Sequence, residues 1–152
     1  MSVSGEVSGD GVVTVERYIA ARPETVFSFF TDRDKWLSWM GQEGEFVFAP
    51  GGAYRTDVTG GNVAEGRFVE LDPPKRLVFT WGWAEGAMPV PPGSTTVEIT
   101  LQPTPDGTLL RLVHRGLPSP EACAAHDEGW KHYVQRLAVR AEGRDPGPDH
   151  WM

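Results

Sequence analysis

The sequence has little cysteine, little positive charge and no long apolar run, and each shortage excludes a class of protein. Cys123 is the single cysteine among 152 residues, so the chain cannot form an internal disulfide or a zinc finger. No stretch approaches the roughly 18 apolar residues of a transmembrane helix. The net charge of −7 argues against nucleic acid or an anionic membrane as the partner. Residues 1–10 lack the features of a secretory signal, so we expect a cytoplasmic protein.

Tryptophan, glycine and proline are plentiful instead. The chain holds six tryptophans, 18 glycines and 13 prolines. Large aromatics between frequent turns favour a sheet-rich fold with a roomy interior. The length fits one domain, for which we expect the bounds 11–142, between a flexible lead (1–10) and a loose tail (143–152).

Local patterns predict the order of the elements. A β-branched run indicates a strand within 11–21, and Pro23 and Asp32 each begin a short helix. An antiparallel meander of about six strands follows. Its predicted strands are 45–49, 53–58, 62–71, 76–83, 94–102 and 108–115. Ser119 then caps a helix that continues to about Glu142.

This order resembles the helix-grip fold of the START-like (SRPBCC, birch-pollen-allergen-like) superfamily. It is most similar to the branch named after the activator of the heat-shock protein 90 ATPase. The stretches that carry the resemblance are 17–30, 36–39 (WLSW), 66–81 (GRFVELDPPKRLVFTW) and 126–130 (HDEGW). The resemblance implies an α+β fold in which a curved antiparallel sheet of about seven strands wraps around the long C-terminal helix. It also implies a cavity between sheet and helix.

Strand alternation and the helix periodicity select candidate pocket residues. They are Trp39, Phe48, Tyr54, Phe79, Trp81, Trp83, Leu112, His114, His126, Trp130 and Tyr133. So many rings on a curved sheet favour a lined cavity, although any one of them could simply fill the core. Within the pocket, His114 and His126 are the candidates for orienting a ligand, or for acid–base chemistry.

One long loop is a candidate lid. The loop 84–93 carries the apolar residues Met88 and Val90. Alternate connections of an antiparallel meander lie at the same end of the sheet, so this loop should meet 59–61 and 116–119 at the mouth of the cavity. We therefore expect the loop to cover the entrance.

The sequence assigns no catalytic residue, no metal site and no cofactor. The helical histidines, His126 and His132, are six residues apart rather than four, and no cluster of carboxylates accompanies them. Cys123 lacks an evident base, and no phosphate loop or dinucleotide motif is present.

The leading hypothesis is the binding of a small hydrophobic molecule, aromatic or acyl and lipid-like, in the internal cavity. One alternative is a cyclase or hydrolase that uses a pocket histidine, although we lean away from an enzyme. The other alternative is a co-chaperone-like interaction module, for which the sequence carries no motif. Homodimer formation stays open.

Overall fold

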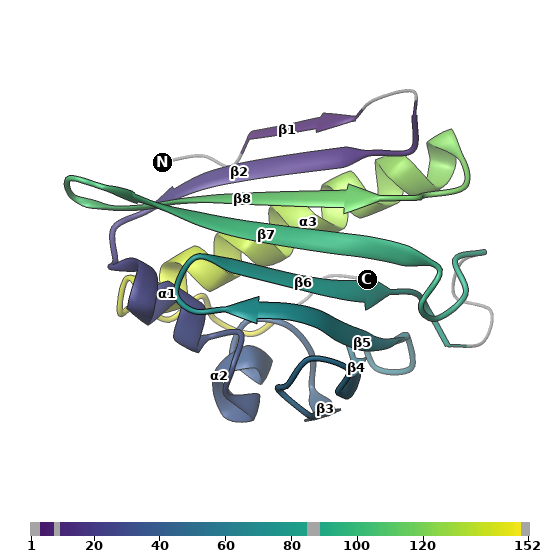
Figure 1. Ribbon diagram of the computed structural model, residues 1–152, viewed down its shortest axis with the longest axis horizontal. Helices are drawn as coiled ribbons and strands as arrows, with labels where there is room; N and C mark the ends of the chain where they lie inside the picture. The colour runs from purple at the N-terminus through teal and green to yellow at the C-terminus, as the bar shows by residue number, and fades with distance from the viewer. Residues whose placement is uncertain (1–3, 8–9, 85–88, 150–152) are drawn as a thin grey trace.

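One eight-stranded antiparallel sheet forms the body of the protein, and a long helix lies against its inner face (Figure 1). The structure is a computed structural model that describes residues 4–7, 10–84 and 89–149. Its elements are β1 (Ser4–Val7), β2 (Val13–Ile19), α1 (Pro23–Ser28), α2 (Arg33–Leu37), β3 (Glu43–Phe46), β4 (Ala53–Asp57), β5 (Val63–Asp72), β6 (Arg76–Trp81), β7 (Thr95–Thr104), β8 (Gly107–Arg115) and α3 (Pro120–Ala141).

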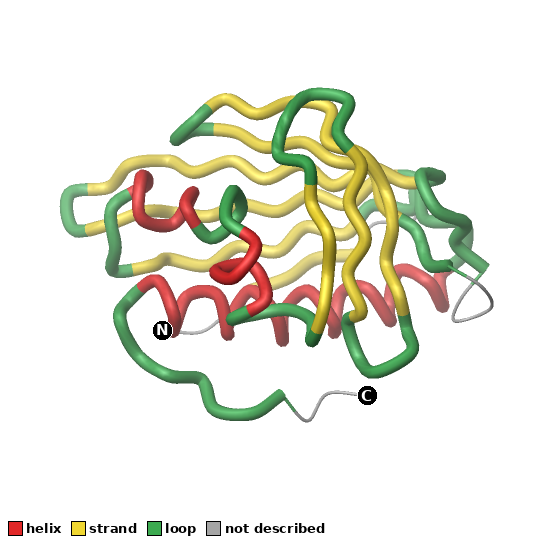
Figure 2. Tube along the Cα trace, turned by 90° about the horizontal axis from the view of Figure 1, so that it is seen from below, coloured by secondary structure: helices red, strands yellow, loops and turns green. Residues whose placement is uncertain are grey.

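The strand order is β1-β2-β8-β7-β6-β5-β4-β3, so β2, near the start of the chain, pairs with β8, the last strand. Figure 2 shows the strands curving around α3, which packs against β2 and β1. The helix-grip α+β fold predicted from the sequence is confirmed. The sheet has eight strands where about seven were expected.

The helix starts form as their capping residues predict. Asp32 accepts a hydrogen bond from the backbone N–H of Lys35 at 3.0 Å, and Ser119 accepts one from Ala122 at 3.1 Å. Each cap satisfies a donor that the first turn of a helix leaves free. As predicted, α3 stops near Glu142, and Gly143 follows with a positive φ of 83°.

The N-terminal lead holds a strand that the sequence does not predict. Ser4–Val7 pairs with β2 in the register Gly5 to Val15, so this part of the lead is a strand. A side chain at Gly5 would meet Lys131 and Asp127 of α3. The sequence of this segment gives no local strand pattern, but Gly5 is small enough for the space between β2 and α3.

The tail is likewise held against α3 over its described part. Arg136 donates to the backbone oxygen of Gly147 at 3.0 Å, and Tyr133 donates to Asp149 at 2.7 Å. Figure 2 shows the chain turning back after the helix and running alongside it. Residues 143–149 therefore contact α3, and how loosely the tail is held stays a prediction.

The strand predicted over 76–83 ends earlier, at Trp81. A side chain at Gly82 would lie 1.9 Å from the backbone oxygen of Pro91, so only glycine lets the loop approach this closely. Beyond Gly82, Trp83 forms an isolated bridge with Ala64 and donates its backbone N–H to Val90 at 2.7 Å. The loop is thus fastened to the strand end.

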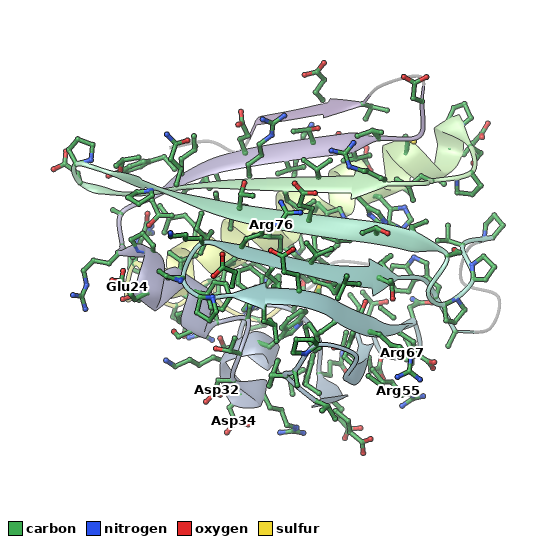
Figure 3. The ribbon with its side chains drawn as sticks, viewed as in Figure 1. Glu24, Asp32, Asp34, Arg55, Arg67 and Arg76 are labelled. Carbon is green, nitrogen blue, oxygen red and sulfur yellow. The ribbon has the colours of Figure 1, made fainter. Side chains whose placement is uncertain are left out.

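The two faces of the sheet differ in polarity. On the outer face, Arg76 lies between Glu70 and Glu98, at 3.0 and 2.9 Å (Figure 3). The inner face of the sheet holds side chains such as Phe79 of β6 and Leu112 of β8, which are 0% and 1% exposed. This alternation places the aromatic residues between the sheet and α3.

Replacing Leu137 by alanine should test this packing. Leu137 of α3 is fully buried in the core, so Leu137→Ala should lower the free energy of unfolding by about 2–5 kcal/mol, measured by urea denaturation. Val69→Ala is the control, because Val69 is 55% exposed and its loss should change stability by less than about 0.5 kcal/mol. Equal effects of the two substitutions would contradict the buried position of the helix.

Candidate functional site

The predicted pocket aromatics meet in one continuous set of ring contacts on the inner face of the sheet. Phe79 lies 6.3 Å from Trp81, and Trp81 lies 4.9 Å from Trp130 of α3. We call the set the aromatic array. Its members are Phe30, Trp36, Trp39, Phe46, Phe48, Tyr54, Phe68, Phe79, Trp81, Trp83, His114, His126 and Trp130.

His126 joins the helix to the loop end of the sheet. Trp83 Nε1 donates to His126 Nε2 at 3.0 Å, and His126 Nδ1 lies 2.7 Å from the backbone oxygen of Ala122. An indole N–H only donates, so Nε2 must be the accepting nitrogen. The proton of the neutral ring is therefore on Nδ1 and points to Ala122.

His114 repeats the arrangement from the opposite side. Trp130 Nε1 of α3 donates to His114 Nδ1 at 3.0 Å, which places the ring proton on Nε2. Nε2 then donates to Thr95 Oγ1 at 2.7 Å. The Thr95 hydroxyl in turn donates a hydrogen bond to the backbone oxygen of Trp81, also at 2.7 Å. A chain of three hydrogen bonds thus connects Trp130 of α3 with the backbone of β6.

Both imidazoles are held neutral. Burial lowers the pKa of His114 well below the usual value, and the nearby His126 lowers it further. Burial also lowers the pKa of His126, although its bond to Ala122 acts in the opposite direction. The two rings stand perpendicular, 5.0 Å apart, so a charge on one would oppose a charge on the other.

These bonds restrict what the two histidines can do. Each imidazole nitrogen already has a partner, so neither ring offers a free lone pair. To take up a proton, a ring must first break its bond to Trp83 or Trp130. In this structure, the two histidines therefore hold the tryptophans in place.

Trp36 contacts the array residues of β3–β6, and the sequence does not predict it as a pocket residue. Its ring contacts Tyr54 at 6.2 Å and Phe79 at 5.7 Å. The five residues of α2 are too few for hydrophobic periodicity to assign an inner face. The only available signal was the spacing of three residues between Trp36 and Trp39, which places both indoles on one side of a helical turn.

Contacts with α3 fix the position of α2. Arg136 donates to the backbone oxygen of Trp39 at 3.1 Å, and Arg140 donates to that of Ser38 at 3.0 Å. The indole of Trp39 donates to the backbone oxygen of Phe29 at 3.1 Å. The end of α2 is thus held by the long helix, with Trp39 almost fully buried beside Trp36.

Three predicted residues lie apart from these ring contacts. Tyr133 is buried, but its hydroxyl faces Asp149 of the tail, and burial together with Asp149 raises its pKa. Val90 is fully buried at the loop end, and Leu112 lies in the core below the rings. Met88, the other expected lid residue, lies outside the described residues.

The described parts of the three expected mouth loops lie at one end of the sheet (Figure 1). Ala84 donates its backbone N–H to Val63 at 2.8 Å, which joins the loop after β6 to the hairpin between β4 and β5. The Cβ position of Gly116, which precedes α3, lies 3.7 Å from the backbone oxygen of Ser94. Trp83, which is partly exposed, is the member of the array at this end.

Within 4–7, 10–84 and 89–149, no three His, Cys, Asp or Glu side chains lie close enough together to hold a metal ion. Cys123 is buried, and burial raises the pKa of its thiol, which disfavours the reactive thiolate. Over the same ranges, no helix is both long and apolar enough to cross a bilayer.

Acidification should destabilise the fold through the two histidines. In an unfolded chain, histidine titrates near pH 6.5. Because burial lowers the folded-state pKa of both rings, the unfolded chain takes up protons first as the pH falls. The free energy of unfolding should therefore fall below about pH 6.5, by up to about 1.4 kcal/mol per pH unit for each ring that stays neutral.

Urea denaturation between about pH 7.5 and pH 5.5 measures this slope, and ¹⁵N NMR of the imidazoles reports the tautomers directly. His126→Gln keeps an acceptor for Trp83 but cannot titrate, so it should flatten the slope. A stability that is constant over this range, or two imidazoles that both titrate near pH 6.5, would contradict the neutral assignment.

Comparison with known proteins agrees with this architecture. The family described as "Activator of Hsp90 ATPase homolog 1-like protein" (AHSA1) matches residues 20–142. An AHSA1-like protein from Rhizobium etli, solved by NMR, is 52% identical, with a TM-score of 0.74 over 93% of this chain and 88% of that one. Among proteins with curated functions, none matches the sequence.

More distant structures share the fold. DynU16, a protein of the dynemicin biosynthetic locus, is 25% identical with a TM-score of 0.80, over 94% of this chain and 51% of that one. The Aha1 dimer from Colwellia psychrerythraea is 20% identical with a TM-score of 0.74, over 86% of this chain and 96% of that one. The family match and the relative from Rhizobium etli show that the chain belongs to the AHSA1-like family of the START-like superfamily.

Proposed function

We propose that the protein binds a small, largely apolar molecule with an aromatic body between the sheet and α3, at the aromatic array. The observation that carries this proposal is the continuity of the array. Rings follow one another from Phe46 and Phe48, which are only partly buried, through Trp81 to the partly exposed Trp83. Apolar surface with a few fixed polar groups is typical of ligand sites.

The hydrogen-bonded histidines support a binding role. A ligand site must keep its shape when it is empty, and the bonds from Trp83 and Trp130 to the two imidazoles fix both indoles. Edge-to-face contacts such as that between Trp81 and Trp83, at 5.4 Å and 86°, add rigidity. Preorganised rings of this kind reduce the ordering entropy that binding would otherwise cost.

The two alternative functions have less support. A cyclase or hydrolase would need a histidine nitrogen free to exchange a proton with the substrate, and all four nitrogens of His114 and His126 have partners. A co-chaperone role rests on the name of the family alone. The occurrence of DynU16 in a biosynthetic locus is more compatible with a small-molecule ligand in a cytoplasmic setting.

A fluorescence titration tests the proposal. 1-Aminoanthracene should quench the intrinsic tryptophan emission saturably, because a probe bound in the array lies close enough to the indoles to accept their excitation energy. At about 0.3 kcal/mol per heavy atom, a ligand of roughly 15–20 heavy atoms reaches about −5 to −6 kcal/mol, a Kd of tens to hundreds of micromolar. If neither this probe nor a panel of sterols, flavonoids and aromatic polyketides causes a saturable change, the array is only a packed core.

A matched pair of variants tests where the probe binds. Trp83→Leu removes a partly exposed ring of the array and should weaken 1-aminoanthracene binding several-fold. Phe29→Leu removes another partly buried ring, which lies outside the array beneath Lys35, and should leave the affinity unchanged. Equal losses in the two variants would place the probe elsewhere.

A further inference from the structure

Two indole N–H groups inside the aromatic array lack an acceptor. Trp36 and Trp81 are 0% and 2% exposed, and neither Nε1 atom has a hydrogen-bond partner among the described residues. The hydroxyl of Thr56, which is also fully buried, has none in that part of the chain either. Thr56 follows Tyr54 by two residues on β4, so both side chains face the interior.

The other described tryptophans show that this is not the rule in this protein. Trp39, Trp83 and Trp130 each donate to an acceptor, at 3.0–3.1 Å. A buried donor without a partner destabilises a fold by roughly 1–3 kcal/mol, and such groups are rare in native proteins. A hydrogen-bond acceptor from outside the chain would satisfy these donors.

The two indole rings with unpartnered donors have two aromatic neighbours in common. Both indole rings contact Phe79, with centroids at 5.7 and 6.3 Å, and both contact Tyr54, at 6.2 and 6.5 Å. Trp36 and Trp81 therefore belong to the same part of the array. Edge-on contacts, such as that of Trp36 with Phe30 at 87°, orient the indoles but replace an N–H···O bond poorly.

The polar groups near these donors are already in use. Tyr54 donates its hydroxyl to the backbone oxygen of Thr80 at 2.5 Å, and the backbone oxygen of Trp81 accepts from Thr95. Both nitrogens of His114 are occupied. The unpartnered indole N–H groups can only donate, so the complementary group on the ligand is an acceptor.

The acceptor should be uncharged. Both indoles are neutral, and burying a carboxylate without a cation is strongly unfavourable. The buried cation Arg17 is committed to Gln135 at 2.9 Å, to the backbone oxygen of Tyr18 and to Glu142 at 3.8 Å. A fatty acid would therefore leave its carboxylate poorly compensated, whereas the oxygen of a ketone or similar carbonyl requires no counter-charge.

We propose that the ligand is a flat, uncharged aromatic carbonyl compound whose oxygen accepts a hydrogen bond from the indole of Trp36 or Trp81. This inference rests on the proposed function and specifies it further, because a purely hydrocarbon or acyl ligand would fill the same space without satisfying the donors.

Fluorene and 9-fluorenone form a matched pair of probes, since they differ only at the carbonyl. Indole Nε1–H resonances of the ¹⁵N-labelled protein, assigned by Trp→Phe variants, report hydrogen bonding directly. Saturation with 9-fluorenone should move the Trp36 or Trp81 resonance downfield, whereas fluorene should leave both without such a shift. The resonances of Trp83 and Trp130, whose acceptors are internal, serve as references.

A variant that removes only the N–H group makes the test quantitative. Replacing Trp81 by the nearly isosteric 3-benzothienylalanine should weaken 9-fluorenone binding about three- to tenfold, the value of one hydrogen bond. Fluorene binding by the same variant should not change, which controls for altered packing. The equivalent replacement of Trp36 is an independent repeat should the first variant fold poorly.

The outcomes separate this inference from the proposed function. If both probes bind, and 9-fluorenone causes no downfield shift and loses no affinity in either variant, the carbonyl inference is wrong and the binding function stands. If the free indoles show cross-peaks to bound water that persist with 9-fluorenone, their partner is water, and the inference is again overturned. If neither probe binds, nor any of the wider panel, both proposals fail.

Discussion

The hydrogen bonds between indole and imidazole are the interaction on which the interior depends. One runs from Trp83 at the end of the sheet to His126 of the helix, and the other from Trp130 of the helix to His114 of the sheet. Both bonds join α3 to the sheet, and the donor is on the sheet side in the first and on the helix in the second. Neither helix nor sheet can shift without breaking one of them. The arrangement of the array and the position of α3 against β8 thus depend on the same two bonds.

Much of the fold could be predicted from the sequence because its signals are local. Asp32 and Ser119 form the caps that their residue types predict, and alternation along β6–β8 correctly identified the buried face that carries Phe79 and His114. The pocket residues themselves stay a prediction. The structure brings most of them into one array, but their contact with a ligand is a matter for experiment.

The remaining features depend on partners that are distant in the sequence. The strand at Ser4–Val7 forms because β2 offers an edge and α3 leaves room beside Gly5, and no local pattern encodes either condition. The central position of Trp36 follows from the way Arg136 and Arg140 hold the end of α2. The sequence placed both histidines inside, yet it could not show that indoles would occupy their nitrogens.

The short outer strands limit how two copies of the protein can meet. The sheet is open, and its edges are β1 and β3, each of four residues. Exposed carboxylates lie on both: Glu6 on β1, and Glu43 and Glu45 on β3. Joining like edges of two molecules would bring these negative charges together in a chain whose net charge is already −7, which disfavours a continuous intermolecular sheet. Self-association would therefore have to use a face of the molecule rather than its strand edges, and added salt would weaken the repulsion that keeps these edges apart.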